Sequence, residues 1–201
     1  MELLILPVMI AIGAYLLKSR DQNQRIALLG RYLSQHQIEK LMENLTETYL
    51  RALGEPDPER QAQIWNLSAT AETALCEQFN RFVAEFSRVD EADARVSRLA
   101  FSFPYADRLF PGATFDLRKA LSIHAHGITH AASNRLNQSI KGKAFTLSAE
   151  LFLMQHTCHW FCRSKGVASA RMQVRHKTSY AQLVQSVAPQ TRTAYCTLVG
   201  C

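Results

Sequence analysis

The first residues of the chain are apolar in every direction around a helix, which sets them apart from the remaining residues. Over residues 3–17 the Tyr15 hydroxyl is the only polar side-chain group, and the polar stretch 18–20 comes next. A helix on the surface of a globular domain would carry a polar stripe. As a helix this segment would rise about 22 Å, against about 30 Å for the hydrocarbon core of a bilayer. The pattern predicts a single transmembrane helix, with residues 1–20 as a membrane anchor.

Two other interpretations of this segment stay open. A secretory signal peptide starts with positive charge, whereas the only charged residue before the apolar run is Glu2. A helix buried inside a globular core would also be apolar on all sides. For an anchor, the basic residues on its C-terminal side, from Lys18 to Arg31, predict the orientation. They place the N-terminus outside the membrane and residues 18–201 in the cytoplasm.

The chain after the anchor shows the 3.6-residue period of amphipathic helices and no sustained alternation typical of strands. Apolar residues share one face over residues 38–53, before Gly54. Ser34 and Gln37 have the spacing of a capping box at the start of this helix. Asp57 followed by Pro58 predicts the start of a second helix, which extends to about residue 88.

Further helices are expected over residues 91–99, 114–138 and 146–166, then after Thr178 and after Pro189. The aromatic-rich stretch 101–113 is expected to be a connecting loop that packs onto the body. The sequence therefore predicts an all-α fold. About six helices form a bundle-like cytosolic domain, residues 21–201, with an acidic part (21–116) and a basic part (117–201).

Composition agrees with one globular core. The chain has 201 residues, of which 47% are hydrophobic and 20% charged, which allows one core and at most two small domains. Five cysteines at irregular spacings do not fit a secreted disulfide framework and favour a reducing compartment.

Charge is distributed unevenly between the two halves of the chain. Residues 1–116 carry 12 basic and 16 acidic residues, a net charge of −4, whereas residues 117–201 carry 11 basic residues and one acid, Glu150, a net charge of +10. A basic half of this size can attract anionic lipid or an acidic protein. The favoured interpretation is that it is a solvated face or packs against the acidic half. Nucleic acid is less favoured, because the basic stretch lacks interleaved aromatics and a helix-turn-helix signature.

The helix expected over residues 146–166 is apolar on most sides and carries one narrow polar strip. This strip consists of Gln155, His156, His159 and Arg163. A polar strip on a central helix needs partners. Either these groups hydrogen-bond to neighbouring helices, or they form a ligand site in which Arg163 and a histidine hold an anion.

Two groups of residues have the chemistry of metal ligands. His126 and His130 lie four apart on one helix, and Cys158, His159 and Cys162 fall within a 100° arc on another. However, the Cys-x3-Cys spacing is not the usual zinc knuckle, and no glutamate follows the first histidine of the pair. Zinc is therefore an alternative, and no cofactor is predicted.

No catalytic motif stands out, since the chain has no phosphate-binding loop, dinucleotide fingerprint or nucleophile elbow. The favoured function is non-enzymatic, an interaction or scaffold domain held at the membrane. The alternative is a helical metal-binding or enzymatic domain that uses these His and Cys residues. The sequence does not identify a substrate or a partner.

Overall fold

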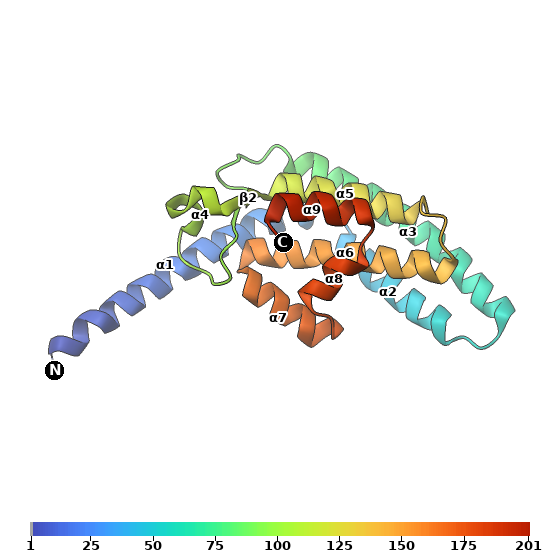
Figure 1. The fold of residues 1–201 in the computed structure, drawn as a ribbon, viewed down its shortest axis with the longest axis horizontal. Helices are drawn as coiled ribbons and strands as arrows, with labels where there is room; N and C mark the ends of the chain where they lie inside the picture. Colours follow the sequence, from blue (N-terminus) through green and yellow to red (C-terminus); the bar gives the residue numbers. More distant parts are fainter. Residues whose placement is uncertain (1) are drawn as a thin grey trace.

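The computed structural model describes residues 2–201, with their side chains from residue 5 onward (Figure 1). The helices are α1 (Glu2–Leu33), α2 (Ile38–Gly54), α3 (Pro58–Phe86), α4 (Ala106–Leu109), α5 (Leu117–Ala132), α6 (Ile140–Cys162), α7 (Lys165–His176), α8 (Tyr180–Ser186) and α9 (Pro189–Val199). A 3₁₀ turn, η1 (Pro111–Ala113), and two short strands, β1 (Arg95–Ser97) and β2 (Thr114–Asp116), interrupt them. The predicted all-α class is confirmed.

Helix α6 is the centre of the body. It packs against α5 on one side and against α7 and α8 on the other, while α9 covers α5 (Figure 1). Its buried side chains point in several directions around the helix axis, including Leu147, Leu153 and Trp160. The prediction of a central helix is therefore confirmed.

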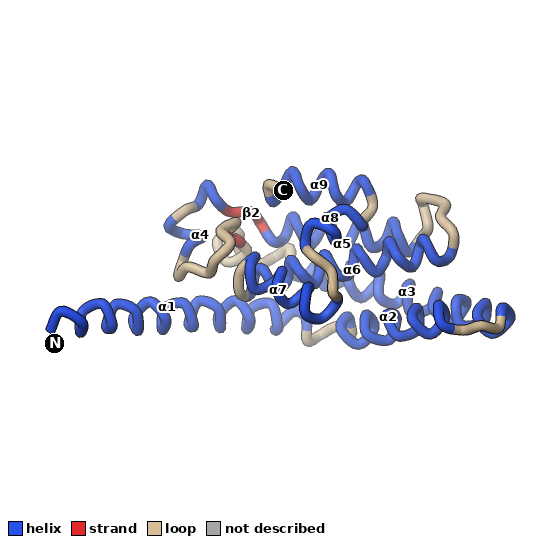
Figure 2. The backbone as a smooth tube through the Cα atoms, turned by 60° about the horizontal axis from the view of Figure 1, so that its bottom comes forward, coloured by secondary structure: helices blue, strands red, loops and turns tan. Residues whose placement is uncertain are grey.

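An antiparallel hairpin of α2 and α3 joins this centre to the base of α1 (Figure 2). Asp57 caps α3 as the sequence predicts, because its carboxylate accepts a hydrogen bond from the Glu59 backbone N–H. Farther along α3, a row of fully buried phenylalanines, Phe79, Phe82 and Phe86, fills the interior. Tyr32 of α1 packs edge-on against Phe86, with ring centroids 5.4 Å apart.

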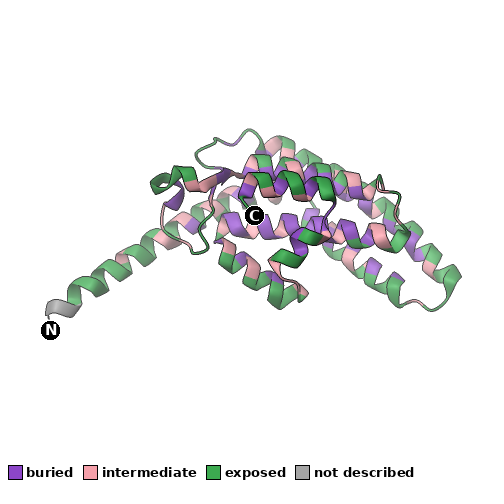
Figure 3. Cartoon of the chain, viewed as in Figure 1, coloured by how far each residue is buried: buried purple, intermediate pink, exposed green. Residues whose placement is uncertain are grey.

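Helix α1 has two halves with different surroundings (Figure 3). The C-terminal half packs on the body, where Gln22 and Leu29 are buried. Residues 5–17 of α1, here called the apolar arm, extend away from the body and are exposed along nearly their whole length. Within the described residues, no helix is long and apolar enough to cross a membrane. The transmembrane helix predicted over residues 1–20 therefore has no support from the structure.

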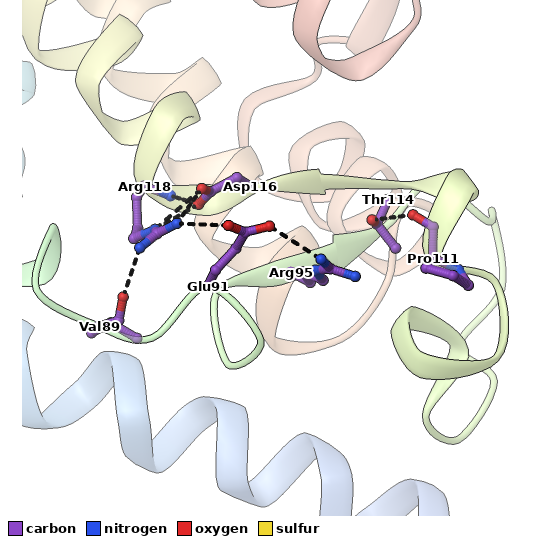
Figure 4. Close-up of polar contacts among 7 residues, drawn as sticks. All are labelled: Val89, Glu91, Arg95, Pro111, Thr114, Asp116 and Arg118. Atoms are coloured by element: carbon purple, nitrogen blue, oxygen red, sulfur yellow. Dashed lines mark hydrogen bonds and ion pairs between the residues drawn. The ribbon is translucent and has the colours of Figure 1, made fainter.

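A small hairpin replaces the helix expected over residues 91–99, and that prediction is wrong. Strand β1 pairs antiparallel with β2, and Val96 lies opposite Phe115. Asp116 caps α5 through the Arg118 backbone N–H at 2.8 Å and also binds the Arg118 guanidinium (Figure 4). Arg118 donates in turn to the Val89 carbonyl oxygen at 3.0 Å. This network fixes the hairpin at the start of α5.

Other boundaries also differ from the predicted ones. Helix α2 begins after Gln37 with no side-chain cap, and the Ser34 hydroxyl donates instead to the Arg31 carbonyl oxygen. Helix α6 begins at Ile140 rather than Thr146 and runs through Gly142. One glycine costs a helix only about 1 kcal/mol, which tertiary packing offsets.

The cysteine prediction also needs correction. A disulfide joins Cys196, in the last turn of α9, to Cys201, which follows the helix, with their Cα atoms 4.7 Å apart. Cys76, Cys158 and Cys162 are free thiols. Disulfides are rare in the cytosol, so the cysteines no longer argue for a reducing compartment.

Candidate functional site

The apolar arm exposes large hydrophobic side chains on all its sides. Their exposed fractions lie between 47% and 69% for Ile5, Leu6, Val8, Met9, Ile10, Ile12, Tyr15, Leu16 and Leu17. Single exposed apolar residues are normal on soluble proteins, but a contiguous group of this size marks a surface that contacts lipid or another protein. The arm is therefore the first candidate site.

A second group of exposed apolar side chains lies beside the base of the arm. The stretch 101–113 was expected to pack onto the body, yet Phe101 is 85% exposed. Gln22 of α1 donates to the Ser102 hydroxyl at 2.9 Å, and Arg25 pairs with Asp107 at the same distance. These contacts hold the loop at the end of the body from which the arm leaves (Figures 1 and 2). The exposed apolar residues of this loop, together with Leu99 just before it, are Leu99, Phe101, Phe103, Leu109 and Phe110.

The polar strip of α6 does not face one way, because His156 turns into the core. Its Nε2 lies 3.1 Å from the Ser169 hydroxyl of α7, and its ring stacks on Tyr180 of α8 at 4.6 Å. Burial, followed by the nearby charge of Lys165, lowers the pKa of His156 to about 3. The ring is therefore neutral near pH 7, and its contacts are those of a packing residue.

The other members of the strip line a groove between α2 and α1 on one side and α6 and α7 on the other. The groove has two adjoining chambers. The first, of about 330 Å³, has walls from α1 and α6 that include Leu29, Leu33, Met154, Cys158 and Cys162. The second, of about 430 Å³, lies between α2 and α7. Its lining residues are Glu39, Met42, Glu43, Thr46, Glu47, Phe152, Gln155, His159, Arg171, Arg175 and His176.

His159 stands where the two chambers meet, since it lines both. Burial, then the charges of Arg171 and Arg175, lowers its pKa to about 4, so the ring is neutral near pH 7. Arg163 closes the far end of the first chamber, and its guanidinium donates to the Gln22 side-chain oxygen at 2.5 Å. Arg163 and His159 thus line the same chamber, but the Arg163 guanidinium is bonded to Gln22, and the anion site stays a prediction.

The predicted metal ligands do not converge on a single site. His126 is exposed and His130 half-buried on α5, whereas Cys158, His159 and Cys162 line the groove. Burial raises the pKa of Cys162 to about 11 and that of Cys158 further, so both thiols stay protonated. Among residues 5–201, no three His, Cys, Asp or Glu side chains lie close enough to hold a metal ion. The zinc alternative gains no support.

Three buried polar groups were not singled out from the sequence. His124 lies 2.9 Å from the Thr157 hydroxyl, which is 3.1 Å from the Tyr195 hydroxyl. Glu150 accepts a hydrogen bond from the Ala188 backbone N–H at 3.0 Å. Glu72 of α3 bonds to Tyr49 of α2 and to Lys143 of α6. The signal for Glu150 was present in the sequence, because it is the only acid among the last 85 residues and lies on a mostly apolar helix.

Known proteins add no further guidance: the chain matches no protein-family model, no curated protein and no solved structure. The function must therefore be inferred from the arm and the groove.

Proposed function

We propose that this protein is a non-enzymatic interaction or scaffold domain attached to a membrane by its apolar arm. The observation that supports this most strongly is the exposure of the arm on every side. A helix that is apolar all round is typical of buried or membrane helices, because a helix on a protein surface keeps a polar face for water. Lipid would bury the apolar side chains of the arm, which the rest of the described chain leaves exposed.

The energetic argument favours lipid over water. Moving one Leu, Ile or Val side chain from water into apolar surroundings contributes about 1.5–3 kcal/mol. The arm has nine large exposed side chains. Its backbone N–H and C=O groups are hydrogen-bonded within the helix, so insertion into lipid would leave few polar groups without a hydrogen-bond partner. The Tyr15 hydroxyl lies close to the polar end, where it can reach the interface.

The residues around the base of the arm suit a lipid interface. Lys18 and Arg20 follow the arm directly and can reach the phosphates of anionic head groups. The exposed phenylalanines of the loop after β1 lie at the same end of the body (Figure 1). Apolar rings beside basic side chains are the usual composition of surfaces that rest on membranes.

The orientation is part of the proposal. Basic residues after the arm favour the cytoplasmic side for residues 18–201 and the outer side for the N-terminus. The Cys196–Cys201 disulfide is the observation that counts against the cytoplasmic side, because disulfides are rare in the cytosol. The arm rises about 20 Å, less than the 30 Å of the hydrocarbon core, so a spanning arrangement would require local thinning of the bilayer or snorkelling by Lys18 and Arg20. The basic half would then face the anionic cytoplasmic leaflet.

Flotation of the full-length protein with neutral phospholipid vesicles tests the attachment. We expect the wild-type protein to float with the vesicles at high salt, because burial of the arm does not depend on charge. Ile10→Lys should weaken the association about a hundredfold, since a charged residue in the bilayer costs roughly 2.5–3.5 kcal/mol.

Leu67→Lys is the matched control, because Leu67 is similarly exposed but lies on α3 of the body. It should float like the wild type. If Ile10→Lys floats as well as Leu67→Lys, or the wild-type protein stays dissolved without vesicles or detergent, the attachment proposal is wrong.

A further inference from the structure

The two chambers of the groove differ in the polarity of their lining residues, and this difference indicates which kind of ligand would fit. The first chamber is mostly apolar, although Glu39, Arg163 and Arg171 also line it. The second has carboxylates on one wall and guanidinium groups on the other. We propose that the groove binds a single-chain lipid whose zwitterionic head group carries a phosphate and an ammonium. This inference rests on the groove alone and does not require that the arm enters a bilayer.

The first chamber fits one acyl chain. Its volume of about 330 Å³ is at the lower end of the roughly 300–1,000 Å³ of small-molecule sites. Met154 and Cys162 mark its extent along α6, about 12 Å at 1.5 Å per residue. One chain spans about 15 Å in half of a 30 Å hydrocarbon core, so the chamber covers most of the length of one chain. The apolar lining comes from Ile26, Leu29, Leu33, Ile38, Met42, Met154, Cys158 and Cys162.

The second chamber fits a head group with both charges. Glu39, Glu43 and Glu47 recur every four residues along α2, and Arg171 and Arg175 are four apart on α7. Within the described residues, no ion pair joins the two rows. Arginine binds phosphate through two parallel N–H donors, and a carboxylate accepts from an ammonium. A zwitterion would satisfy both walls at once.

A ligand with only one sign of charge would be repelled by the like-charged wall of the second chamber. An anionic head group would approach the guanidinium groups but face three carboxylates, and a cationic one would face two guanidinium groups.

Photo-crosslinking tests the proposal with the full-length protein in nanodiscs of unlabelled phospholipid. The probe is a lysophosphatidylethanolamine with a diazirine in its acyl chain, and mass spectrometry locates the labelled residues. We expect labels on the tail chamber, at Met154, Cys158 and Leu33. Arg171→Glu and Glu43→Lys should each reduce these labels about tenfold, the effect of roughly 1.4 kcal/mol.

Both substituted residues are exposed and have no side-chain partner in the described structure, so these variants should fold. Arg135→Glu is the matched control, because Arg135 is exposed on the turn after α5 and lines neither chamber. It should leave the labelling unchanged. A fatty acid and an alkyltrimethylammonium with the same diazirine chain should label the groove about tenfold less than the zwitterion.

Three results would overturn the proposal: equal groove labelling by all three head groups, groove labelling that neither charge reversal reduces, or no label in the groove. Labels confined to residues 5–17 would support the membrane attachment and contradict the groove site. Labels in the groove with none on the arm would support the groove site and contradict the attachment.

Discussion

Glu72→Ala is expected to lower the free energy of unfolding by about 3 kcal/mol, near the low end for a broken buried ion pair. Glu72 is almost fully buried on α3, where it accepts a hydrogen bond from the Tyr49 hydroxyl at 2.6 Å and pairs with Lys143 of α6. Alanine would leave both partners without an acceptor. The low end applies because Lys143 keeps some contact with solvent.

Urea unfolding followed by far-ultraviolet circular dichroism measures this loss. Glu77→Ala is the matched control on the same helix, because Glu77 forms only an exposed pair with Arg81. It should change the unfolding free energy by less than about 1 kcal/mol. A Glu72→Ala protein as stable as the Glu77→Ala protein would show that the buried group does not hold α2, α3 and α6 together.

Stability should also depend on the protonation of Glu150. Burial raises the pKa of this carboxyl from 4.5 to about 7, against smaller opposing effects of the nearby Thr191 side chain and of the hydrogen bond from the Ala188 backbone N–H. Because the folded state holds the proton more tightly than the unfolded state, the stabilisation is complete below pH 4.5. It is lost as the pH rises from about 4.5 to 7, by about 3 kcal/mol at 1.36 kcal/mol per pKa unit.

Glu150→Gln isolates this effect, since the amide has similar size and no charge to bury. The buried rings of His124 and His156 act in the opposite direction, because burial lowers their pKa values and they resist protonation at low pH. The quantity to measure is therefore the difference in unfolding free energy between the two proteins at pH 5 and pH 7. A difference that does not change with pH would contradict the raised pKa.

Long amphipathic helices were predictable because their apolar stripes also form the core. Most of the stripe over residues 38–53 became the buried face of α2, although Leu53 at its end is exposed. The Asp57 and Pro58 signal set the start of α3. Short elements carry no such pattern. Strands β1 and β2 have three residues each and are specified by pairing between Val96 and Phe115, which are distant in sequence.

The candidate site was predictable only in part for the same reason. Helix α6 supplies Gln155 and His159, and Arg163 follows its last residue, so their shared strip could be identified from the period alone. Glu39 and Arg171, which also line the groove, come from α2 and α7. Spacing along the sequence does not show which residues of different helices lie close together. His156, for example, lies in the core because Tyr180 and Ser169 of neighbouring helices cover it.

The depth of Ile10 in a bilayer tests the central claim most directly. A fluorescent amino acid is placed at position 10 of the full-length protein in vesicles, and at position 67 of the body as a control. Lipids with brominated acyl chains quench fluorophores inside the bilayer, whereas aqueous iodide quenches those in water. Attachment by the arm predicts strong quenching by bromine and weak quenching by iodide at position 10, with the reverse at position 67. Equal access of iodide to both positions would contradict it.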